Sequence, residues 1–488
     1  MNNYIKTFLF ILVGIFFTTS TALKAQHILF ERIFDETLAQ ASYIIANENK
    51  EAIIIDPKRD IDTYLDYAKK HSLTIKYVTE THIHADFLSG AQELAHATNA
   101  DLLLSAEGGS DWQYQFPHQS LKDKQIISLG NVIIEVMHTP GHTPESLTFL
   151  VKDAKQKLIP TKAITGDFIF AGDVGRPDLL EKAVGKVGSQ YEGAHQLFES
   201  LNKFKKLDQF TEIWPGHGAG SFCGKSLSTI PHSTLKQEMV TNPAFQLLNN
   251  KEAFTKFILE GQPEPPQYFA VMKQWNKQLR PLMIKKQQLN PLTITEFEQA
   301  IKNNLLVIDA RKKDSVQKGF VPGSLHIEGG KSFSTFVGSL VNYKNQIILV
   351  AAENQIDDLT RKLMRIGIDN IYGYISDLKE YKGLKTSKII QAEDVQKYMK
   401  QANVQLIDVR TINEYENGHI QGFENISLNS LEQNTSKIKK DNPVIIHCQS
   451  GLRSAMAYSI LEKLGYTNIL NYSGSINDWT AKKLPLVK

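Results

Sequence analysis

The first half of the chain alternates short apolar runs with helical segments. Between residues 26 and 260, Ile/Val-rich runs of strand length are separated by segments such as 60–71. Such a mixture of strands and helices predicts a layered α/β core. The runs cover residues 52–55, 75–78, 126–136 and 146–151.

Two breaks separate this half from the rest of the chain. The proline-rich stretch 262–266 interrupts the pattern, a helix-like segment follows at 268–279, and a second break lies near Asn290 and Pro291. We therefore place a first domain at 26–285.

Beyond the second break the chain repeats itself. The apolar run that ends in Asp309 returns in the run that ends in Asp408, and the run before Ala352 matches the run before Cys448. The paired positions lie 99 and 96 residues apart, from 309 to 408 and from 352 to 448. This period is too long for a solenoid. It predicts two tandem α/β domains of one fold, with buried parallel strands written as continuous apolar runs. These domains span residues 291–386 and 388–488.

Composition agrees with a globular chain of several domains. At about 150 residues per domain, 488 residues suggest roughly three domains. The content of 42% hydrophobic and 22% charged residues is typical of folded proteins. The net charge is only +3, and no Lys/Arg stripe with interleaved aromatic residues is present, which argues against nucleic acid as a partner.

The N-terminus has the pattern of a secretory signal. Lys6 precedes an apolar run at 8–17, and the small residues that follow offer cleavage sites after Ala22 or Ala25. The apolar run is shorter than the roughly 20 residues that span a bilayer. We predict a signal peptide at 1–25, export to the periplasm of a bacterium, and a mature chain without a membrane span. An uncleaved membrane anchor is the alternative.

A cluster of potential metal ligands follows the second apolar run. His82, His84 and Asp86 occupy alternate positions, and imidazole with carboxylate suits zinc or non-haem iron. A solvated polar loop is the alternative for this motif alone. His142, Asp167 and His217 each lie beside glycine or proline in a turn after an apolar run. Turns of this kind can present side chains from separate loops to one ion.

The chain has two cysteines, which excludes a disulfide scaffold. Cys448 follows the strand-like run 444–447 and precedes the helical run 455–464, so backbone N–H groups and the helix end stabilise its thiolate. Arg453 adds a fixed positive charge. A phosphatase phosphate loop has a similar outline but also needs an aspartate acid. Cys223 lies in a glycine-rich stretch near Lys225, which favours an accessible thiolate that binds substrate by carrying a persulfide sulfur near the metal; a small buried residue is the alternative.

The ordered motifs of the first domain resemble those of the metallo-β-lactamase superfamily. Phe87 replaces the third motif histidine, which makes a two-metal site of the glyoxalase II type doubtful. The resemblance to the persulfide dioxygenases of this superfamily implies a single ferrous iron held by the first motif histidine, the turn histidine and the bridging aspartate. It also implies that Arg176 holds the anionic end of the substrate, an ordinary surface salt bridge being the alternative. The implied iron ligands are His82, His142 and Asp167, with His84, Asp86 and His217 as near-site groups.

The last domain resembles the rhodanese sulfurtransferases, over residues 388–488. The resemblance implies that Cys448 carries a persulfide cradled by the loop amides of Gln449, Ser450, Gly451 and Leu452, with Arg453 alongside. The copy at 291–386 has Ala352 at the cysteine position, so it resembles a rhodanese domain without activity, retained for packing or positioning.

These resemblances together predict an αββα metallo-β-lactamase sandwich followed by two rhodanese-like α/β domains with parallel sheets. The implied activity is oxidation of a small persulfide, such as glutathione persulfide, by O2 to sulfite at mononuclear Fe(II), coupled to thiosulfate formation at Cys448 in sulfide detoxification. Two alternatives stay open: a glyoxalase II-type zinc thioester hydrolase fused to a sulfurtransferase, and a non-catalytic sulfur carrier or sensor. The sequence leaves the oligomeric state open, a homo-oligomer included.

Overall fold

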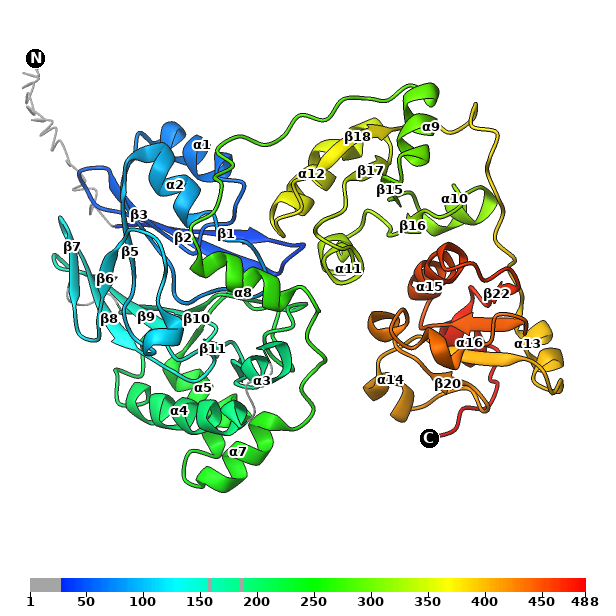
Figure 1. The fold of residues 1–488 in the computed structure, drawn as a ribbon. Helices are drawn as coiled ribbons and strands as arrows, with labels where there is room; N and C mark the ends of the chain where they lie inside the picture. The colour runs from blue at the N-terminus through cyan, green and yellow to red at the C-terminus, as the bar shows by residue number, and fades with distance from the viewer. Residues whose placement is uncertain (1–27, 157–159, 185–187) are drawn as a thin grey trace, which may run out of the picture.

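The computed structural model describes residues 28–156, 160–184 and 188–488. The predicted signal peptide at 1–25 lies outside the described residues. Figure 1 shows a larger α/β unit on the left and two smaller α/β units on the right, with α8 (Phe269–Lys277) between them. Within the described ranges, no helix is long and apolar enough to cross a membrane.

Two six-stranded sheets face each other in the first domain. Their strand orders are β1-β2-β3-β4-β5-β6 and β14-β13-β10-β9-β8-β7. The strands of the first sheet are β1 (Leu29–Asp35), β2 (Gln40–Ala46), β3 (Glu51–Ile55), β4 (Thr74–Thr79), β5 (Asp101–Ser105) and β6 (Gln119–Leu121). Those of the second are β7 (Ile126–Leu129), β8 (Val132–His138), β9 (Leu147–Asp153), β10 (Lys162–Gly166), β13 (Glu212–Pro215) and β14 (Ser233–Thr234). A short hairpin joins β11 (Ile169–Phe170) to β12 (Asp173–Val174).

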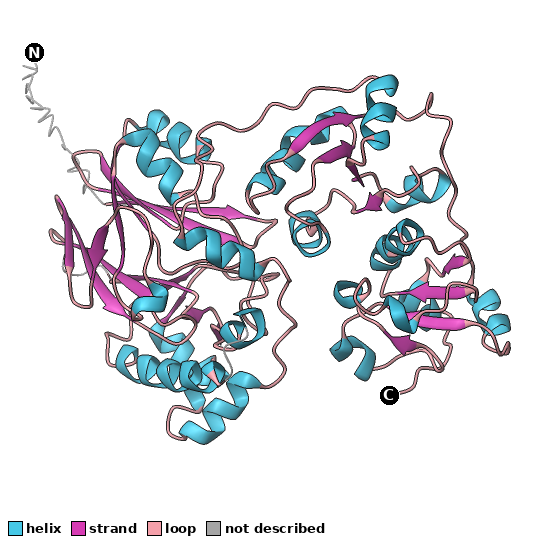
Figure 2. Ribbon diagram, in the orientation of Figure 1, coloured by secondary structure: helices cyan, strands magenta, loops and turns pink. Residues whose placement is uncertain are grey.

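Alternation along the strands creates the layers. In β2, Tyr43 and Ile45 pack between the two sheets, whereas Ile44 faces the helices outside the first sheet. These outer helices are α1 (Asp62–His71) and α2 (Ala91–Thr98). The second sheet is covered by α4 (Ser189–Phe204), α5 (Leu235–Thr241), α6 (Pro243–Gln246) and α7 (Lys251–Leu259). The predicted αββα sandwich is therefore confirmed, as the cyan helices outside the magenta sheets of Figure 2 show. The short helices η1 (Ser110–Trp112) and α3 (Leu179–Val184) complete the domain.

One predicted strand is wrong in its extent. The apolar run 126–136 forms two antiparallel strands, β7 and β8, in which Leu129 pairs with Val132. Gly130 lies in the turn with φ of 57°, a left-handed conformation that glycine adopts without strain. The turn needs only two residues, so the hairpin is hidden in a nearly continuous apolar run.

The rest of the chain forms two four-stranded parallel sheets with matching strand order. The orders are β16-β15-β17-β18 and β20-β19-β21-β22, which agrees with the predicted repeat. The first sheet comprises β15 (Leu306–Asp309), β16 (Leu325–His326), β17 (Ile347–Val350) and β18 (Ile371–Ile375), with α9 (Ile294–Lys302), α10 (Lys313–Lys318), α11 (Phe333–Leu340), η2 (Glu353–Gln355) and α12 (Ile356–Met364). The second comprises β19 (Gln405–Asp408), β20 (Glu424–Asn425), β21 (Val444–His447) and β22 (Ile469–Asn471), with α13 (Ala392–Tyr398), α14 (Ile412–Glu416), η3 (Leu428–Ser430), η4 (Thr435–Lys437), α15 (Leu452–Lys463) and α16 (Ser475–Ala481).

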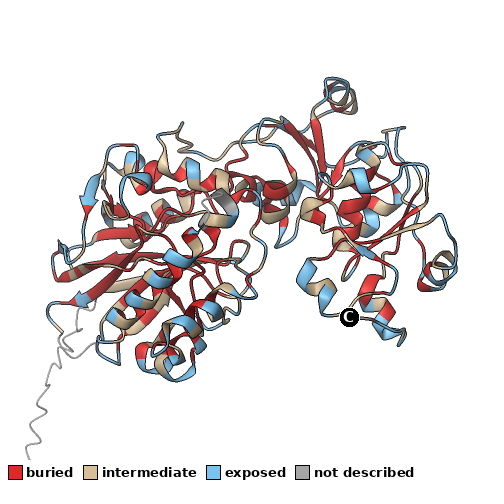
Figure 3. Ribbon diagram, turned by 60° about the horizontal axis from the view of Figure 1, so that its bottom comes forward, coloured by how far each residue is buried: buried red, intermediate tan, exposed pale blue. Residues whose placement is uncertain are grey.

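The three units are packed together. One apolar cluster joins α8, the middle sheet and α15, and the backbone N–H of His326 in β16 donates to Ser459 Oγ in α15 at 3.0 Å. The predicted limit between the first two domains falls in irregular chain between α8 and α9. Figure 3 shows buried strands inside each unit and buried helical turns where the units meet. The helix after the Cys448 loop is thereby fixed against the middle unit.

Candidate metal centre and sulfur-transfer loop

The loop after β4 holds His82 in one orientation. The Asp56 carboxylate accepts hydrogen bonds from the Thr81 backbone N–H at 2.7 Å and from Thr81 Oγ1 at 2.9 Å. Because that hydroxyl proton goes to Asp56, Thr81 Oγ1 accepts from His82 Nδ1, which lies 2.9 Å away. His82 Nε2 is left as the nitrogen with a free lone pair, the form in which histidine binds a metal.

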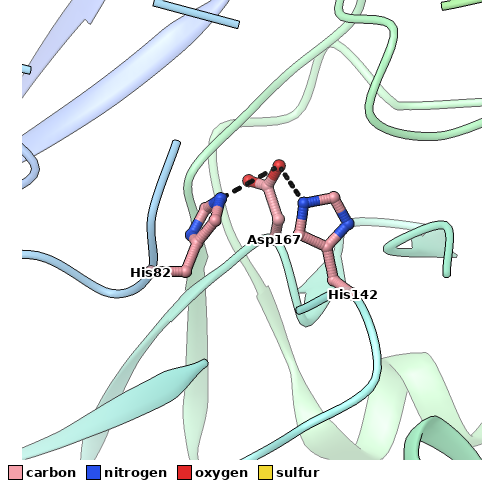
Figure 4. Close-up of side chains that lie close together, drawn as sticks. All are labelled: His82, His142 and Asp167. Atoms are coloured by element: carbon pink, nitrogen blue, oxygen red, sulfur yellow. Dashed lines mark ion pairs between the residues drawn. The ribbon is translucent and has the colours of Figure 1, made fainter. Parts of the chain in front are cut away.

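His142 and Asp167 reach the same point from two other loops. His142 lies in the turn between β8 and β9, and its Nδ1 donates to the Arg176 carbonyl at 2.9 Å. Asp167 follows β10, and its Oδ2 lies 3.5 Å from His142 Nε2 and 3.8 Å from His82 Nε2. Figure 4 shows the two imidazoles on either side of the carboxylate. One donor atom from each residue lies within 4.8 Å of the others, so the structure brings the three predicted ligands together.

Gly166 is required for this geometry. Its φ is 51°, and a Cβ atom there would lie 2.3 Å from Thr81 Oγ1. Only glycine lets β10 approach the Thr81 loop and deliver Asp167 beside His82.

The donor set fits a metal ion. Both Asp167 carboxylate oxygens and His217 Nε2 are buried without a hydrogen-bond partner among the described residues, a state that is costly for polar atoms unless an ion or water binds them. Burial, followed by the neighbouring His84 and His142, holds the pKa of His82 well below its usual value, and burial also lowers the pKa of His142. Neutral imidazoles beside a carboxylate are suitable ligands for iron or zinc.

A second group of donors lies next to the first. Asp86, His217 and Cys223 also bring one donor atom each within 4.8 Å of one another. His217 Nε2 is 3.2 Å from Asp86 Oδ2 and 3.5 Å from Asp167 Oδ1, while its Nδ1 donates to the Ala39 carbonyl at 3.0 Å. Asp167 therefore lies between the two groups. The sequence placed Asp86, His217 and Cys223 near the metal, Cys223 as a sulfur carrier six residues after His217, but it did not indicate that the Cys223 sulfur is a potential ligand beside the other two.

The environment of Cys223 differs from the expected one. The residue is 2% exposed. Burial, followed by the Asp167 and Asp86 carboxylates, raises the pKa of its thiol well above the usual value. The prediction of an accessible thiolate is thus wrong for this structure, because Lys225 directs its ammonium to the Phe257 carbonyl and not to the sulfur.

His84 and Phe87 lie beside the centre and outside both groups. His84 Nε2 is 3.1 Å from Asp56 Oδ1, and its ring lies 4.4 Å from the buried ring of Phe87, tilted by 37°. Burial opposes protonation of His84, but the Asp56 carboxylate outweighs it and raises the pKa to about 9. Glu145, which the sequence did not indicate, holds the same loop, since its Oε1 accepts from the Ile83 N–H at 2.8 Å.

Arg176 is not placed to bind a substrate. Its side chain is completely buried, and its guanidinium makes two hydrogen bonds of 2.7 Å to Asp178. A third hydrogen bond of 3.1 Å goes to the Phe222 carbonyl. The expected substrate contact and the alternative of a surface salt bridge are therefore both wrong. Arg176 is a core residue that fixes the turn before Cys223.

In the last domain, the loop after β21 encloses Cys448 as predicted. The thiol is 1% exposed, and the Gly451 N–H donates to its sulfur at 3.1 Å. The Gln449 side chain donates outward to Asn477, and Ser450 follows it in the loop before Gly451. Leu452 begins α15, three residues earlier than the helix expected at 455. The corresponding loop of the middle unit begins at Ala352 and has no sulfur.

The charge of Arg453 is neutralised by a partner that the sequence did not indicate. Its guanidinium forms a bidentate pair with Glu414 at 2.6 and 2.7 Å. Burial would raise the pKa of Glu414, yet Arg453 and Thr411 lower it to about 2. Arg453 is thus a fixed, paired cation at the edge of the loop.

Comparisons with known proteins agree with this arrangement. The sequence profile of the Metallo-beta-lactamase superfamily matches residues 36–217, and that of the Rhodanese-like domain matches residues 391–482. The crystal structure of a metallo-beta-lactamase from Staphylococcus aureus subsp. aureus COL is 38% identical, with a TM-score of 0.65, and covers 72% of this chain and 99% of that one. The likeness therefore extends beyond residues 36–217.

Two curated relatives match the first domain. The probable polyketide biosynthesis zinc-dependent hydrolase BaeB of Bacillus velezensis is 25% identical over 218 residues, which are 44% of this chain and 85% of that protein. A hydroxyacylglutathione hydrolase of Prochlorococcus marinus is 27% identical over 171 residues, 35% of this chain and 62% of its own length. The chain belongs to the metallo-β-lactamase superfamily and carries a rhodanese-like domain near its C-terminus.

Proposed function

We propose that the protein oxidises the terminal sulfur of a low-molecular-weight persulfide to sulfite at a single iron ion, and combines sulfite with sulfane sulfur at Cys448 to form thiosulfate. The observation that carries the proposal is the group of His82, His142 and Asp167, whose free donor atoms converge from three loops. Two histidines and one carboxylate on one side of an ion are typical of non-haem Fe(II) oxygenases, because they leave positions open for O2 and substrate.

The chain's own residues supply orientation and exclude water. The hydrogen bonds from Nδ1 of His82 and His142 fix both rings and leave Nε2 for the ion. Both rings are shielded from bulk solvent, since His82 is 2% and His142 3% exposed. Bound ferrous iron would supply the redox chemistry that joins O2 to sulfur.

The oxidation balances without a further reductant. A persulfide RSSH, O2 and water give the thiol RSH, sulfite and two protons. The S–S bond breaks, the terminal sulfur is oxidised, and O2 is reduced.

The second half-reaction is a transfer of neutral sulfur. The Cys448 thiolate attacks the terminal sulfur of another persulfide, and the thiol RSH leaves. Sulfite then attacks the outer sulfur on Cys448, which releases thiosulfate and restores the thiolate. The Gly451 N–H, 3.1 Å from the sulfur, stabilises negative charge there.

A second candidate function is a zinc-dependent thioester hydrolase. The observation that favours it is the second donor group, because Cys223 supplies the third ligand that Phe87 cannot. The hydrolase names of the two relatives agree with this candidate. The second donor group offers a place for a second metal ion despite Phe87.

Metal analysis after anaerobic purification separates these functions. The proposal predicts one iron per chain and O2 uptake on addition of glutathione persulfide. Two zinc ions, with cleavage of S-lactoylglutathione and no O2 uptake, would establish the hydrolase. A chain that shows neither activity but exchanges sulfur at Cys448 would be a carrier.

A further inference from the structure

A cavity of about 730 Å³ lies where the three units meet. Each unit contributes to its wall: Phe222 and Gln262 from the first, Ser332 and Phe336 from the middle, and Asn413 and Arg453 from the last. The volume falls in the range of small-molecule sites. Gln267 Nε2 donates to the Asn429 carbonyl at 2.6 Å beside the cavity and ties the first unit to the last.

One part of the cavity wall is the turn between His217 and Cys223, two members of the second donor group. Gly220 and Phe222 line the cavity, and this turn begins after His217 and ends in Cys223. The Phe222 carbonyl is held by the buried Arg176. Phe222 is partly buried and directly precedes Cys223 of the second donor group, so the cavity borders the turn that carries this cysteine.

Another part of the wall is the edge of the loop that encloses Cys448. Arg453 lines the cavity two residues after Gly451, whose N–H donates to the Cys448 sulfur. Thr411, which caps α14 and bonds to Glu414, lines it as well. One hollow thus borders the loops of both chemical centres, although Cys223 and Cys448 are themselves buried.

The lining matches a zwitterionic peptide in polarity. Phe222, Phe336 and Ile412 form an apolar part, and Ile412 is 49% exposed although it is a large aliphatic residue. Charges of both signs surround it, including Lys331 and Glu36, whose exposed pair at 3.3 Å is weak enough to exchange for ligand charges. A tripeptide thiol has carboxylates, an ammonium group and an apolar carbon skeleton.

We propose that this cavity binds a low-molecular-weight peptide thiol and its persulfide, and that this one site admits carrier molecules in turn for both centres. This inference deepens the proposed function and rests on it for the identity of the sulfur cargo. Persulfide held here reaches the Cys448 loop on one side, where the thiolate takes the terminal sulfur and the carrier leaves as thiol. Sulfite, formed at the metal centre from another persulfide molecule, then attacks the outer sulfur on Cys448 and leaves as thiosulfate, which restores the thiolate.

Binding of S-methylglutathione, an unreactive thioether, measured by calorimetry on the full chain tests the cavity without any turnover. Ser332→Trp and Asn413→Trp fill it from two different units, and both residues are exposed. We expect each variant to bind at least about tenfold more weakly. Ser436→Trp is the control, because Ser436 is exposed in the last unit and does not line the cavity. In turnover, both filling variants should raise the ratio of free sulfite to thiosulfate.

Equal binding by the wild type and both filling variants would overturn the inference, even if persulfide-dependent O2 uptake is present. Loss of binding in both variants with binding retained in Ser436→Trp supports it, even if no O2 uptake is found. The fate of the cavity is therefore separable from the fate of the proposed oxidation.

Discussion

Arg365, which directly follows α12, should be the most costly residue to remove at the contact between the first and middle units. Its guanidinium bonds to both oxygens of Asp60 at 2.9 and 2.6 Å and lies 2.6 Å from Asp35. The arginine side chain is 8% exposed, and the two carboxylates are 1% and 4% exposed. Arg365→Met keeps most of the apolar volume but leaves two buried carboxylates with less compensation.

The expected loss of unfolding free energy follows from the pKa of the Asp35 carboxyl and from the burial of the pairs. Burial would raise the pKa of Asp35, yet Arg365 and Lys58 lower it from 3.8 to about 2. At about 1.4 kcal/mol per pKa unit, the Asp35 interactions contribute about 2 kcal/mol. Asp60 adds a bidentate pair, and removal of one partner from a buried pair typically costs about 3–5 kcal/mol. We therefore expect Arg365→Met to lower the unfolding free energy by about 3–5 kcal/mol.

Arg361 is a matched control in α12. It pairs with Asp62 at 2.6 Å, and these side chains are 24% and 46% exposed. It reaches the buried Asp60 only at 3.5 Å, farther than Arg365 does. Arg361→Met should cost less than about 1 kcal/mol. Urea unfolding at pH 7, followed by circular dichroism, compares the two variants. Equal losses of stability would refute the reasoning that burial makes the Arg365 pairs strong.

The difference should also depend on pH. The folded pKa of Asp35 lies below its ordinary value, so its contribution is complete above about pH 4 and disappears as the pH falls through about 2. The stability gap between wild type and Arg365→Met should narrow over that interval. A gap that stays constant would show that Asp35 does not contribute.

Three further variants test the two centres. Glu414→Gln should slow sulfur transfer from thiosulfate to cyanide several-fold, because Arg453 loses its bidentate partner. The unfolding free energy should change by less than about 1 kcal/mol. An unchanged rate would contradict the role of Glu414 in positioning Arg453. His142→Ala should bind iron at least about tenfold more weakly, as measured by the iron retained on dialysis against a chelator. His195 is exposed, and His195→Ala should keep its iron. Similar retention by the two variants would remove His142 from the ligand set. Gly166→Ala should lose iron and about 1–3 kcal/mol of stability, because the new Cβ contacts Thr81. Gly172→Ala is the control: its φ is 85° and nothing lies within 4 Å of the new Cβ, so it should keep its iron. Equal iron loss in both variants would contradict the contact argument.

Much of the fold could be predicted because its signals are local. The apolar runs 52–55 and 75–78 and the repeat around Asp309 and Asp408 depend on neighbouring residues, and they lead to β3, β4 and the two parallel sheets. The β7–β8 hairpin was missed because its turn at Gly130 interrupts the apolar run for only two residues.

The site was predictable where a motif names its residues. His82, His142 and Asp167 meet as expected. The neighbours of Cys223 and Arg176 were not predictable, because burial and long-range pairing decide whether a thiol is accessible or an arginine reaches solvent.

The stoichiometry of O2 consumption tests the central claim most directly. With glutathione persulfide under an oxygen electrode, the Cys448→Ser variant should consume one O2 for each persulfide and release the sulfur as sulfite. The wild type should consume one O2 for each two persulfides and release thiosulfate. Absence of persulfide-dependent O2 uptake in iron-loaded wild type would contradict the dioxygenase account, and unchanged thiosulfate output in Cys448→Ser would contradict the role of that cysteine.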